Sequence, residues 1–598
     1  MSKTLPIFPK PQNVSFTSGF FKRLKGWSLQ ILEPRFEEVS RDFFISHAYP
    51  FSKTTSSANL LIKKRTLTHR EGYYLEITPD QICIEAWQEA GVFRALNTLD
   101  KILQHPAFEQ DIPCMRIEDF PVFKQRGFML DVSRCKVPTM ESIFELIDLI
   151  AKIGYNELQL YIEHTFAFAA HAIVWENSSP LTGAEIRKID QYCKARFIEL
   201  VPNLNSFGHF ERWLRHEDYH HLAECPTGFR REEPFMERDH GSTLKPNQAS
   251  LDFMDRLYEE YLPNFSSRNF NVGLDEPWEL GQGWSADQVK SQGKAKVYLQ
   301  HLDGIRRLVE KHGRCMQFWA DVPLEEPENA KLVPPSAKPI IWGYEADHPF
   351  AEQAKAISAC GLSFCLAPGT ATWRSFSGRW PTARQNLANA FTHAFKHKAD
   401  GILLTSWGDC GNHQAWPIFY PSLFLAAQWG WNNQEIDDQS LAVEMNKSLW
   451  SSSMADPASL LMEVGKLDQI IGANIPNASL AWNILFSPQP EKMPGFLQEN
   501  FTKPKLLQGV EFLKSLQNDL DKTQEFQGDG KFHRELSLAI DLNLISLNRG
   551  ISMMGFPSRT NHQSAEIVER FESNWILRAR TGGLEESSKL LKHALSAT

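Results

Sequence analysis

Between about Arg126 and Trp407, short apolar runs alternate with segments in which apolar residues recur at a helical period. A continuous apolar run is typical of a strand buried on both faces, and a period of 3.6 residues is typical of a helix that packs one face on a sheet. We expect eight strands, in the runs GFMLDV, ELQLYIE, FIELVP, FNVGLDE, CMQFWAD, PIIWGYE, FCLAPG and GILLTSWGD.

Eight strand–helix units predict an α/β chain built on a closed (β/α)8, or TIM, barrel. A doubly wound open sheet is the alternative, but neither a GxGxxG motif nor a P-loop follows any of the eight runs. Helix signals fit the alternation, because Thr182 and Glu185 form a capping-box pattern, and Gly154 and Gly361 stand where helices should end.

The pattern divides the chain into three predicted domains. Residues 1–120 should form an α/β accessory domain, since a hairpin with alternating polarity precedes a helix with one apolar face. Residues 121–430 should form the barrel. Residues 431–598 should form a helical C-terminal domain. Arg578 and Arg580 could meet a neighbouring surface, but we expect them to be solvated.

Composition restricts the class of function. The 598 residues are 42% hydrophobic and 23% charged, as in a globular protein, and the net charge of −9 disfavours a nucleic-acid partner. No run approaches the ~20 apolar residues of a membrane-spanning helix, and the first residues lack the apolar core of a secretory signal. The nine cysteines are scattered without a CxxC pair, which fits reduced thiols, so we expect a cytoplasmic protein without a membrane partner.

Acidic, basic and aromatic residues gather where the predicted strands end. In a barrel, the carboxyl ends of the strands and the loops after them form one mouth, and the long connections 165–181 and 206–248 belong to that face. The chain also has 17 Trp, a residue that suits the apolar face and polar edge of a sugar ring. We therefore predict a sugar-binding acid–base site. Its candidates are Asp131, Arg134, Glu163, His164, Asn203, His209, Asp275, Glu276, Trp319, Asp321, Trp342, Tyr344, Trp373, Trp407 and Asp409.

Asp275 and Glu276 are adjacent, whereas successive residues of a strand point to opposite faces. Both carboxylates reach one pocket only where the strand ends and the chain turns, which Pro277 favours. Retaining glycosidases ordinarily use two carboxyls about 5 Å apart and inverting ones about 6.5–9.5 Å, usually from two strands. The seventh strand ends in APG, without a carboxylate. A neighbouring pair instead suits a reaction in which the substrate supplies its own nucleophile, such as a 2-acetamido oxygen.

These segments resemble the barrel signatures of the family-20 glycoside hydrolases, the β-N-acetylhexosaminidases. The resemblance rests on RGFMLDVSR, LYIEHTF, the SFGH that ends at His209, VGLDE and SWGD. The N-terminal domain, with its helix GVFRALNTLDKIL, is similar to the accessory domain of that family, so the resemblance covers roughly residues 1–430.

The resemblance implies roles for the charged candidates. Glu276 would be the general acid and then the general base for water. Asp275 would accept the acetamide N–H, orient the acetamido oxygen toward C1 and stabilise the oxazolinium ion. Arg134 would bind ring hydroxyls, and Asp409 would contact O4 or O6.

Other candidates would have supporting roles by the same resemblance. His209, with Glu163 or His164, would support the acid. The walls around the acetamide and the sugar face would come from Trp319, Trp342 and Trp407.

The chain departs from the family pattern in three places. Leu274 replaces a glycine that commonly precedes the acidic pair, and the last strand carries Asp409 where the family has a glutamate. The tyrosine that usually ends the seventh strand is missing, since that segment runs on to Trp373, and Tyr344 is the candidate substitute. These departures leave the preference between GlcNAc and GalNAc open.

The leading hypothesis is an exo-acting, retaining β-N-acetylhexosaminidase for a glycan or glycoconjugate. Another barrel glycosidase for acetamido sugars, with a different linkage or endo action, is one alternative. A non-catalytic glycan-binding barrel is another, but it should lack Glu276. Neither a metal nor a cofactor is expected, because the chain contains no HxH spacing. The natural glycan, the oligomeric state and the role of the C-terminal domain stay open.

Overall fold

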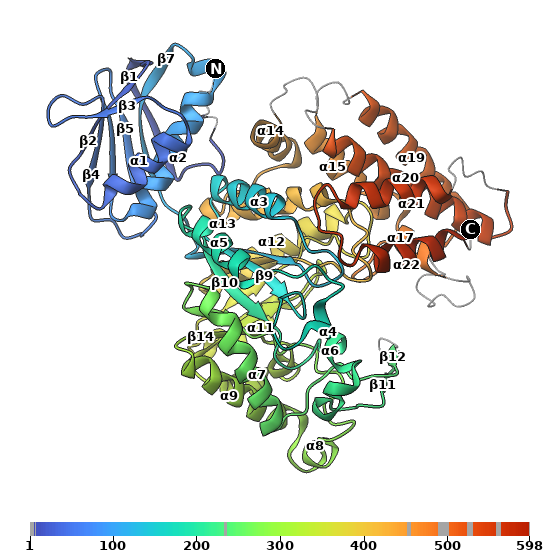
Figure 1. Ribbon diagram of the computed structural model, residues 1–598. Helices are drawn as coiled ribbons and strands as arrows, with labels where there is room; N and C mark the ends of the chain where they lie inside the picture. Colours follow the sequence, from blue (N-terminus) through green and yellow to red (C-terminus); the bar gives the residue numbers. More distant parts are fainter. Residues whose placement is uncertain are drawn as a thin grey trace.

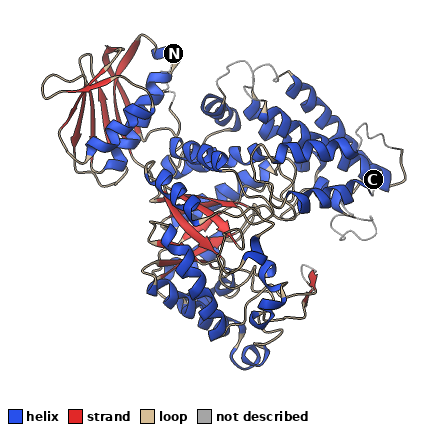
Figure 2. Cartoon of the chain, viewed as in Figure 1, coloured by secondary structure: helices blue, strands red, loops and turns tan. Residues whose placement is uncertain are grey.

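The computed structural model consists of a mixed sheet, a closed barrel and a group of helices that follow one another along the chain (Figure 1). It describes residues 5, 7–232, 236–450, 456–487, 501–522, 530–557 and 564–596. Strands are found in the first two parts, and the elements described in the third part are helices joined by loops (Figure 2).

The N-terminal sheet has seven strands in the order β1-β7-β5-β6-β4-β2-β3. β5 and β6 pair antiparallel, as the hairpin pattern predicts, and the apolar face of α2 lies in the core of this sheet through Val92, Leu96 and Leu99. The strands are β1 Asn13–Lys22, β2 Trp27–Ile31, β3 Phe51–Lys53, β4 Leu60–Lys64, β5 Tyr73–Ile77, β6 Ile82–Ala86 and β7 Asp111–Asp119. The helices are α1 Phe36–Ser46, α2 Glu89–Gln104 and the 3-10 helix Pro106–Phe108.

The eight apolar runs form eight parallel strands that close into a barrel. The predicted TIM barrel is therefore confirmed, and the open-sheet alternative is wrong. Neighbouring strands follow sequence order, and β17 pairs with β8 to close the ring. The strands are β8 Gln125–Asp131, β9 Glu157–Ile162, β10 Glu199–Leu204, β13 Asn269–Asn271, β14 Cys315–Trp319, β15 Ala337–Trp342, β16 Cys365–Ala367 and β17 Gly401–Ser406.

Amphipathic helices surround the barrel and start and stop where the sequence signals stand. Thr182 and Glu185 form a complete capping box, and Gly154 and Gly361 adopt left-handed backbone angles just after α3 and α11. The long helices are α3 Met140–Lys152, α5 Gly183–Lys194, α7 Gln248–Tyr261, α9 Lys294–Lys311, α11 Phe350–Ala359, α12 Trp380–Lys396 and α13 Tyr420–Asn432. The loops add α4 Ala172–Trp175, α6 Glu211–Leu214, α8 Ala286–Gln292, the hairpin of β11 Phe229–Arg231 with β12 Met236–Arg238, and the 3-10 helices Glu217–Leu222, Leu262–Asn264 and Trp416–Phe419.

The connection between β14 and β15 departs from the predicted alternation. All of it is described, and it contains only the short helix α10 (Asp321–Leu324) and the 3-10 helix Pro327–Leu332. Pro327 explains why α10 does not continue, because proline lacks an amide hydrogen and clashes with the preceding turn of a longer helix.

The C-terminal helices pack around α20, which contacts α17, α19 and α21. Within the described residues, none of the chain's helices is both long enough and apolar enough to cross a bilayer. The helices are α14 Asp438–Leu449, α15 Pro457–Val464, α16 Leu467–Ile471, α17 Leu480–Phe486, α19 Lys503–Asp521, α20 Lys531–Met553, α21 Ser564–Trp575 and α22 Leu584–Ser596.

Residues 578–587, hereafter the docking segment, lie against the barrel. The expectation that Arg578 and Arg580 are solvated is wrong. Arg580 pairs with Glu185 at 2.8 Å and Arg578 pairs with Glu535 at 3.3 Å, and both arginines are largely buried. Sequence periodicity does not reveal such contacts, because the partner of Arg580 lies almost 400 residues away in the chain.

The docking segment holds four loops at the carboxyl face of the barrel. Its backbone also forms an isolated bridge between Ala579 and Pro138. The four contacts are Arg580 N with Val137 O after β8, Gly583 N with Asn177 O after β9, Glu586 with Arg212 after β10, and Ser587 O with His413 after β17.

Candidate functional site

The acidic pair lies in a turn just beyond a very short strand. β13 ends at Asn271, and the backbone then passes through left-handed angles at Gly273 (φ +69), Leu274 (φ +73) and Glu276 (φ +47). A glycine is required at 273 because a Cβ there would lie 2.6 Å from the side chain of Asn205. The turn breaks the strand alternation that would otherwise send Asp275 and Glu276 to opposite faces.

His209 brings the two carboxylates together. Its Nε2 lies 3.1 Å from Asp275 Oδ2 and 3.4 Å from Glu276 Oε2. Its Nδ1 lies 3.7 Å from Glu163 Oε1, so this imidazole contacts three of the predicted acidic residues. The adjacent carboxyls therefore serve one site.

The charges of Asp275 and His209 stabilise each other. Burial alone would raise the pKa of Asp275, but the charge of His209 and hydrogen bonds from His209 and Asn205 hold it below its usual value. Burial alone would lower the pKa of His209, but the charge of Asp275 and the contacts with both carboxylates place it well above its usual value. Glu276 is more open, with 32% of its side chain exposed against 8% for Asp275.

Arg134 is fixed beside this group by two carboxylates and two rings. It pairs with Asp131 at 3.0 Å and with Glu163 at 3.1 Å. Its guanidinium lies 4.7 Å from the ring centre of Tyr161 and 5.0 Å from that of Trp407. Burial raises the pKa of Glu163, and the charge of Arg134 opposes that rise. Glu163 therefore holds Arg134 in place through its own buried carboxylate.

The predicted aromatic residues form one cluster, hereafter the aromatic box. It contains Trp319, Trp342, Tyr344, Trp373 and Trp407. Trp407 Nε1 donates a hydrogen bond to Tyr344 Oη at 2.8 Å, and Tyr344 stacks on Trp342 with ring centres 5.2 Å apart. Trp373 is fully covered and meets Tyr344 edge-on, so it supports the box from behind.

Tyr344 and Trp373 fill the space above the end of the seventh strand. A Cβ added at Gly369 would lie 2.5 Å from Trp373 and 2.8 Å from Tyr344. A side chain at the end of β16 is therefore excluded, because a ring from the loop after β15 occupies that place.

Asp409 lies at the rim of the same group. Burial raises its pKa, which the positive charge of Arg134 opposes, and the charges of Asp131 and Glu276 add to the rise. Asp409 is therefore close enough to Arg134 and Glu276 for their charges to act on it.

His164 is not brought to the acidic pair. It lines a separate hollow of about 260 Å³ with Arg212, Arg215 and Glu586. Burial lowers its pKa well below the usual value, and the two arginines add to that effect. Within the described residues His164 makes no hydrogen bond to either carboxylate of the pair, so it does not share the role of His209.

Asn205 is a site residue that the sequence did not reveal. Asn203, which we expected at the mouth, lies wholly inside the barrel and donates to Gln159 Oε1 at 2.9 Å. Asn205, two residues further, donates to Asp275 Oδ1 at 2.9 Å. The two asparagines are two residues apart and point to the same face. Asn203 lies within β10 and faces the barrel interior, whereas Asn205 lies just beyond the end of β10 and reaches the site.

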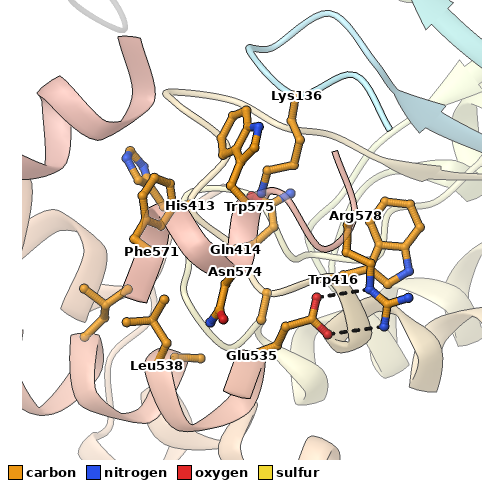
Figure 3. A pocket seen from close by; sticks show the side chains of 13 residues that line it. Lys136, His413, Gln414, Trp416, Glu535, Leu538, Phe571, Asn574, Trp575 and Arg578 are labelled. Carbon is orange, nitrogen blue, oxygen red and sulfur yellow. Dashed lines mark hydrogen bonds and ion pairs between the residues drawn. The ribbon is translucent and has the colours of Figure 1, made fainter. Parts of the chain in front are cut away.

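A second pocket joins the barrel to the C-terminal helices (Figure 3). Lys136 Nζ lies 4.6 Å from the ring centre of Trp575, and burial lowers the pKa of Lys136 to about 8. On the opposite wall, Glu535 pairs with Arg578. Gln414 connects this pocket to the aromatic box, because its Nε2 donates to Trp407 O at 2.5 Å. No cluster of three or more His, Cys, Asp or Glu suited to a metal ion occurs in the described part of the chain.

Two family models match the chain. The model of the catalytic domain of glycosyl hydrolase family 20 matches residues 123–396, and the model of domain 2 of the same family matches residues 4–120. Hexosaminidase D of Bos taurus is 26% identical over 224 residues, which are 35% of this chain and 60% of that protein. The beta-hexosaminidase subunit beta of Felis catus is 24% identical over 349 residues, 52% of this chain and 60% of that one. The chain thus spans about three fifths of the length of these relatives.

Solved structures share the fold. The chitobiase of Flavobacterium johnsoniae superposes with a TM-score of 0.61 at 17% identity, covering 96% of this chain and 99% of that one. The exo beta-N-acetylglucosaminidase of Vibrio harveyi, in complex with N-acetylglucosamine, gives a TM-score of 0.60 at 18% identity and covers 74% of this chain and 77% of that one. The first likeness therefore extends over the C-terminal helices as well as the barrel.

Proposed function

Since the chain belongs to family 20 of the glycoside hydrolases, we propose that it is an exo-acting β-N-acetylhexosaminidase that removes terminal GlcNAc or GalNAc with retention of configuration. The nucleophile is the acetamido oxygen of the substrate itself. The substrate is a glycan or glycoconjugate with a β-linked 2-acetamido sugar at its end.

One observation carries the proposal, namely the adjacent carboxylates bridged by His209 beside the aromatic box. An enzyme nucleophile would need a second carboxylate across the scissile bond, ordinarily about 5 Å from the acid. Here the charge of His209 keeps the pKa of Asp275 low although its carboxylate is buried, which suits a group that steadies a cation.

In the first step, the carboxylate of Asp275 accepts the acetamide N–H and turns the carbonyl oxygen toward C1. That oxygen forms a bond to C1 as the bond from C1 to the leaving oxygen breaks, and Glu276 donates its proton to the leaving oxygen. Such intramolecular attack can have effective molarities on the order of 10⁵–10⁸ M. The aromatic box limits the motion of the acetamide, and Asp275 stabilises the positive oxazolinium ion.

In the second step, Glu276 takes a proton from water as the water oxygen attacks C1. The bond from C1 to the acetamido oxygen breaks, and two inversions at C1 give net retention. The greater exposure of the Glu276 side chain suits a group that meets the leaving oxygen and then water.

The proposal predicts release of p-nitrophenol from the β-GlcNAc or β-GalNAc glycoside, and a loss of about 10²–10⁴-fold in kcat for Glu276→Gln, the range expected for general acid catalysis. Initial rates with purified protein measure this loss. Asp275→Asn should also lose most turnover, and added azide should not restore it, because Asp275 does not attack carbon.

Three results would refute the proposal. One is cleavage of plain β-glucosides without any action on 2-acetamido sugars. Another is azide rescue of Asp275→Asn, which would indicate an enzyme nucleophile. The third is a product with inverted configuration in a proton NMR time course.

A further inference from the structure

The backbone of Glu276 is held in an unfavourable conformation. Glu276 has a φ of +47, a left-handed angle that side chains with a Cβ rarely adopt, and Leu274 has a similar angle two residues earlier. The backbone bonds to β14 continue as far as Gly273, whose carbonyl accepts from Trp319 N at 2.9 Å, so the strand ladder stops before it reaches Glu276. Strained residues persist only where the surroundings hold them, so a specific contact should fix Glu276.

Asp321 supplies that contact. The backbone N–H of Glu276 donates to Asp321 Oδ2 at 3.0 Å. Asp321 is the first residue of α10 and stands two positions after Trp319, which ends β14 and belongs to the aromatic box. The end of one strand therefore places both a wall of the box and the support for the backbone of Glu276.

The surroundings of Asp321 are acidic. Burial raises its pKa to about 8, and the charges of Asp275 and Glu276 contribute to the rise. From the other side, α9 brings Tyr298, whose buried hydroxyl has no hydrogen-bond partner within the described residues and whose pKa is raised by burial and by Asp321. A protonated Asp321 can still accept from the amide of Glu276, and it adds no third negative charge beside the pair.

We propose that Asp321 is a positioning residue for the proton donor. It fixes the backbone of Glu276 so that the carboxyl of Glu276 stays in line with the leaving oxygen, and it does not contact the substrate itself. This inference rests on the proposed function, because it assigns a task to Asp321 only if Glu276 transfers a proton.

The test compares aryl β-GlcNAc glycosides whose leaving groups differ in their need for a proton. For Asp321→Ala we expect kcat/KM to fall about 10- to 100-fold with a 4-methoxyphenyl leaving group, and less than about threefold with 3,4-dinitrophenyl, which departs without protonation. Asp321→Asn retains an oxygen that accepts from the amide, so its values should stay within about threefold of wild type at pH 6 for both substrates. Glu325→Ala is the matched control, because Glu325 follows the same short helix and pairs with Lys294 in solvent.

An equal loss with both leaving groups, or an equal loss for the Ala and Asn variants, would overturn the assignment. If Asp321→Ala does not fold, Asp321→Glu replaces it, since the added methylene displaces the accepting oxygen and should give the same dependence on the leaving group. A crystal structure of either displaced variant gives a readout besides activity, and an unmoved Glu276 backbone would also overturn the assignment. If wild type cleaves no 2-acetamido glycoside, the proposed function fails instead, and the crystallographic comparison still decides whether Asp321 holds Glu276.

Discussion

The ring of Tyr344 occupies the space that a side chain at position 369 would need. Its ring fits between Trp342 and Trp373, and its hydroxyl accepts from the indole of Trp407. A sequence can show that the seventh strand lacks a tyrosine, but it cannot show that the ring from the neighbouring loop lies above that strand. Only the closeness of Gly369 and Tyr344 in the fold shows that Tyr344 fills the place of the missing tyrosine.

Tyr344→Phe tests this arrangement. The ring should remain packed, but the N–H of Trp407 loses its acceptor at the edge of the site, so kcat/KM for the β-GlcNAc glycoside should fall about 5- to 30-fold, the equivalent of roughly 1–2 kcal/mol. Steady-state kinetics with a thermal melt measure the effect, and the melting temperature should change little. Tyr192→Phe, which removes an exposed hydroxyl bonded to Asp148, is the control. An activity within twofold of wild type would contradict a role for the hydroxyl of Tyr344.

The acidic pair could be predicted from the sequence, but the residues that hydrogen-bond to it could not. Asp275 and Glu276 are adjacent in the chain, so their pairing needs no knowledge of the fold. Asn205 and Asp321 reach them from other strands, and their roles depend on where each strand ends. His164 shows the same limit, because it follows Glu163 directly in the chain but faces a different hollow.

The elements were predictable where burial is continuous. A strand buried on both faces reads as an unbroken apolar run, and this held even for β13 and β16, which have three residues each. The connection between β14 and β15 lacks the long helix that the strand–helix alternation predicts. Pro327 follows α10 and prevents it from continuing beyond one turn. A single proline therefore outweighs the strand–helix alternation in this connection.

The interior of the barrel carries a pH-sensitive carboxyl at the start of β9. Glu157 accepts from Gln159 at 2.7 Å, and burial raises its pKa from its usual 4.5 to about 7, with the charge of Glu199 adding to the rise. Between these two values the folded state keeps a proton that the unfolded state has lost. Stability therefore falls as the pH rises from 4.5 to 7, and the loss is complete above pH 7.

Glu157→Gln should remove this loss, because the amide keeps an acceptor for Gln159 and cannot ionise. The variant should be more stable than wild type at pH 8 by roughly 3 kcal/mol and equal to it near pH 4.5. Urea or thermal unfolding at the two pH values measures the difference, with the exposed Glu176→Gln as the control. A stability gain of the same size at both pH values would show that titration of Glu157 is not its cause.

Over the whole molecule, the docking segment connects the C-terminal helices to the loops of the candidate site. The loop after β8 carries Arg134 and is bonded to the segment at residues 137–139. The loop after β17 carries Asp409 and meets the segment at Gly411 and His413. Two residues proposed to bind the sugar are thus held by a part of the chain that contributes no group to the acidic pair.

Arg580→Ala tests this connection. It removes one partner of Glu185 and of the carbonyls of Pro180 and Pro138, so we expect a loss of roughly 2 kcal/mol of stability. We also expect about a tenfold fall in kcat/KM, because the loop that carries Arg134 loses its side-chain contact at Pro138. Hydrogen exchange across residues 133–139 measures the loosening directly. Arg534→Ala, an exposed position on α20, is the control. Unchanged exchange in that loop would separate the docking segment from the site.

The position of the docking segment also sets an order of events during synthesis. All of the barrel strands and all of the proposed site residues have left the ribosome before residues 578–587 are made. A growing chain can therefore close its barrel early, while the four loops at its mouth wait for their anchor until residues 578–587 have been made. The order of the chain thus lets the barrel form before the loops at its mouth are tied together.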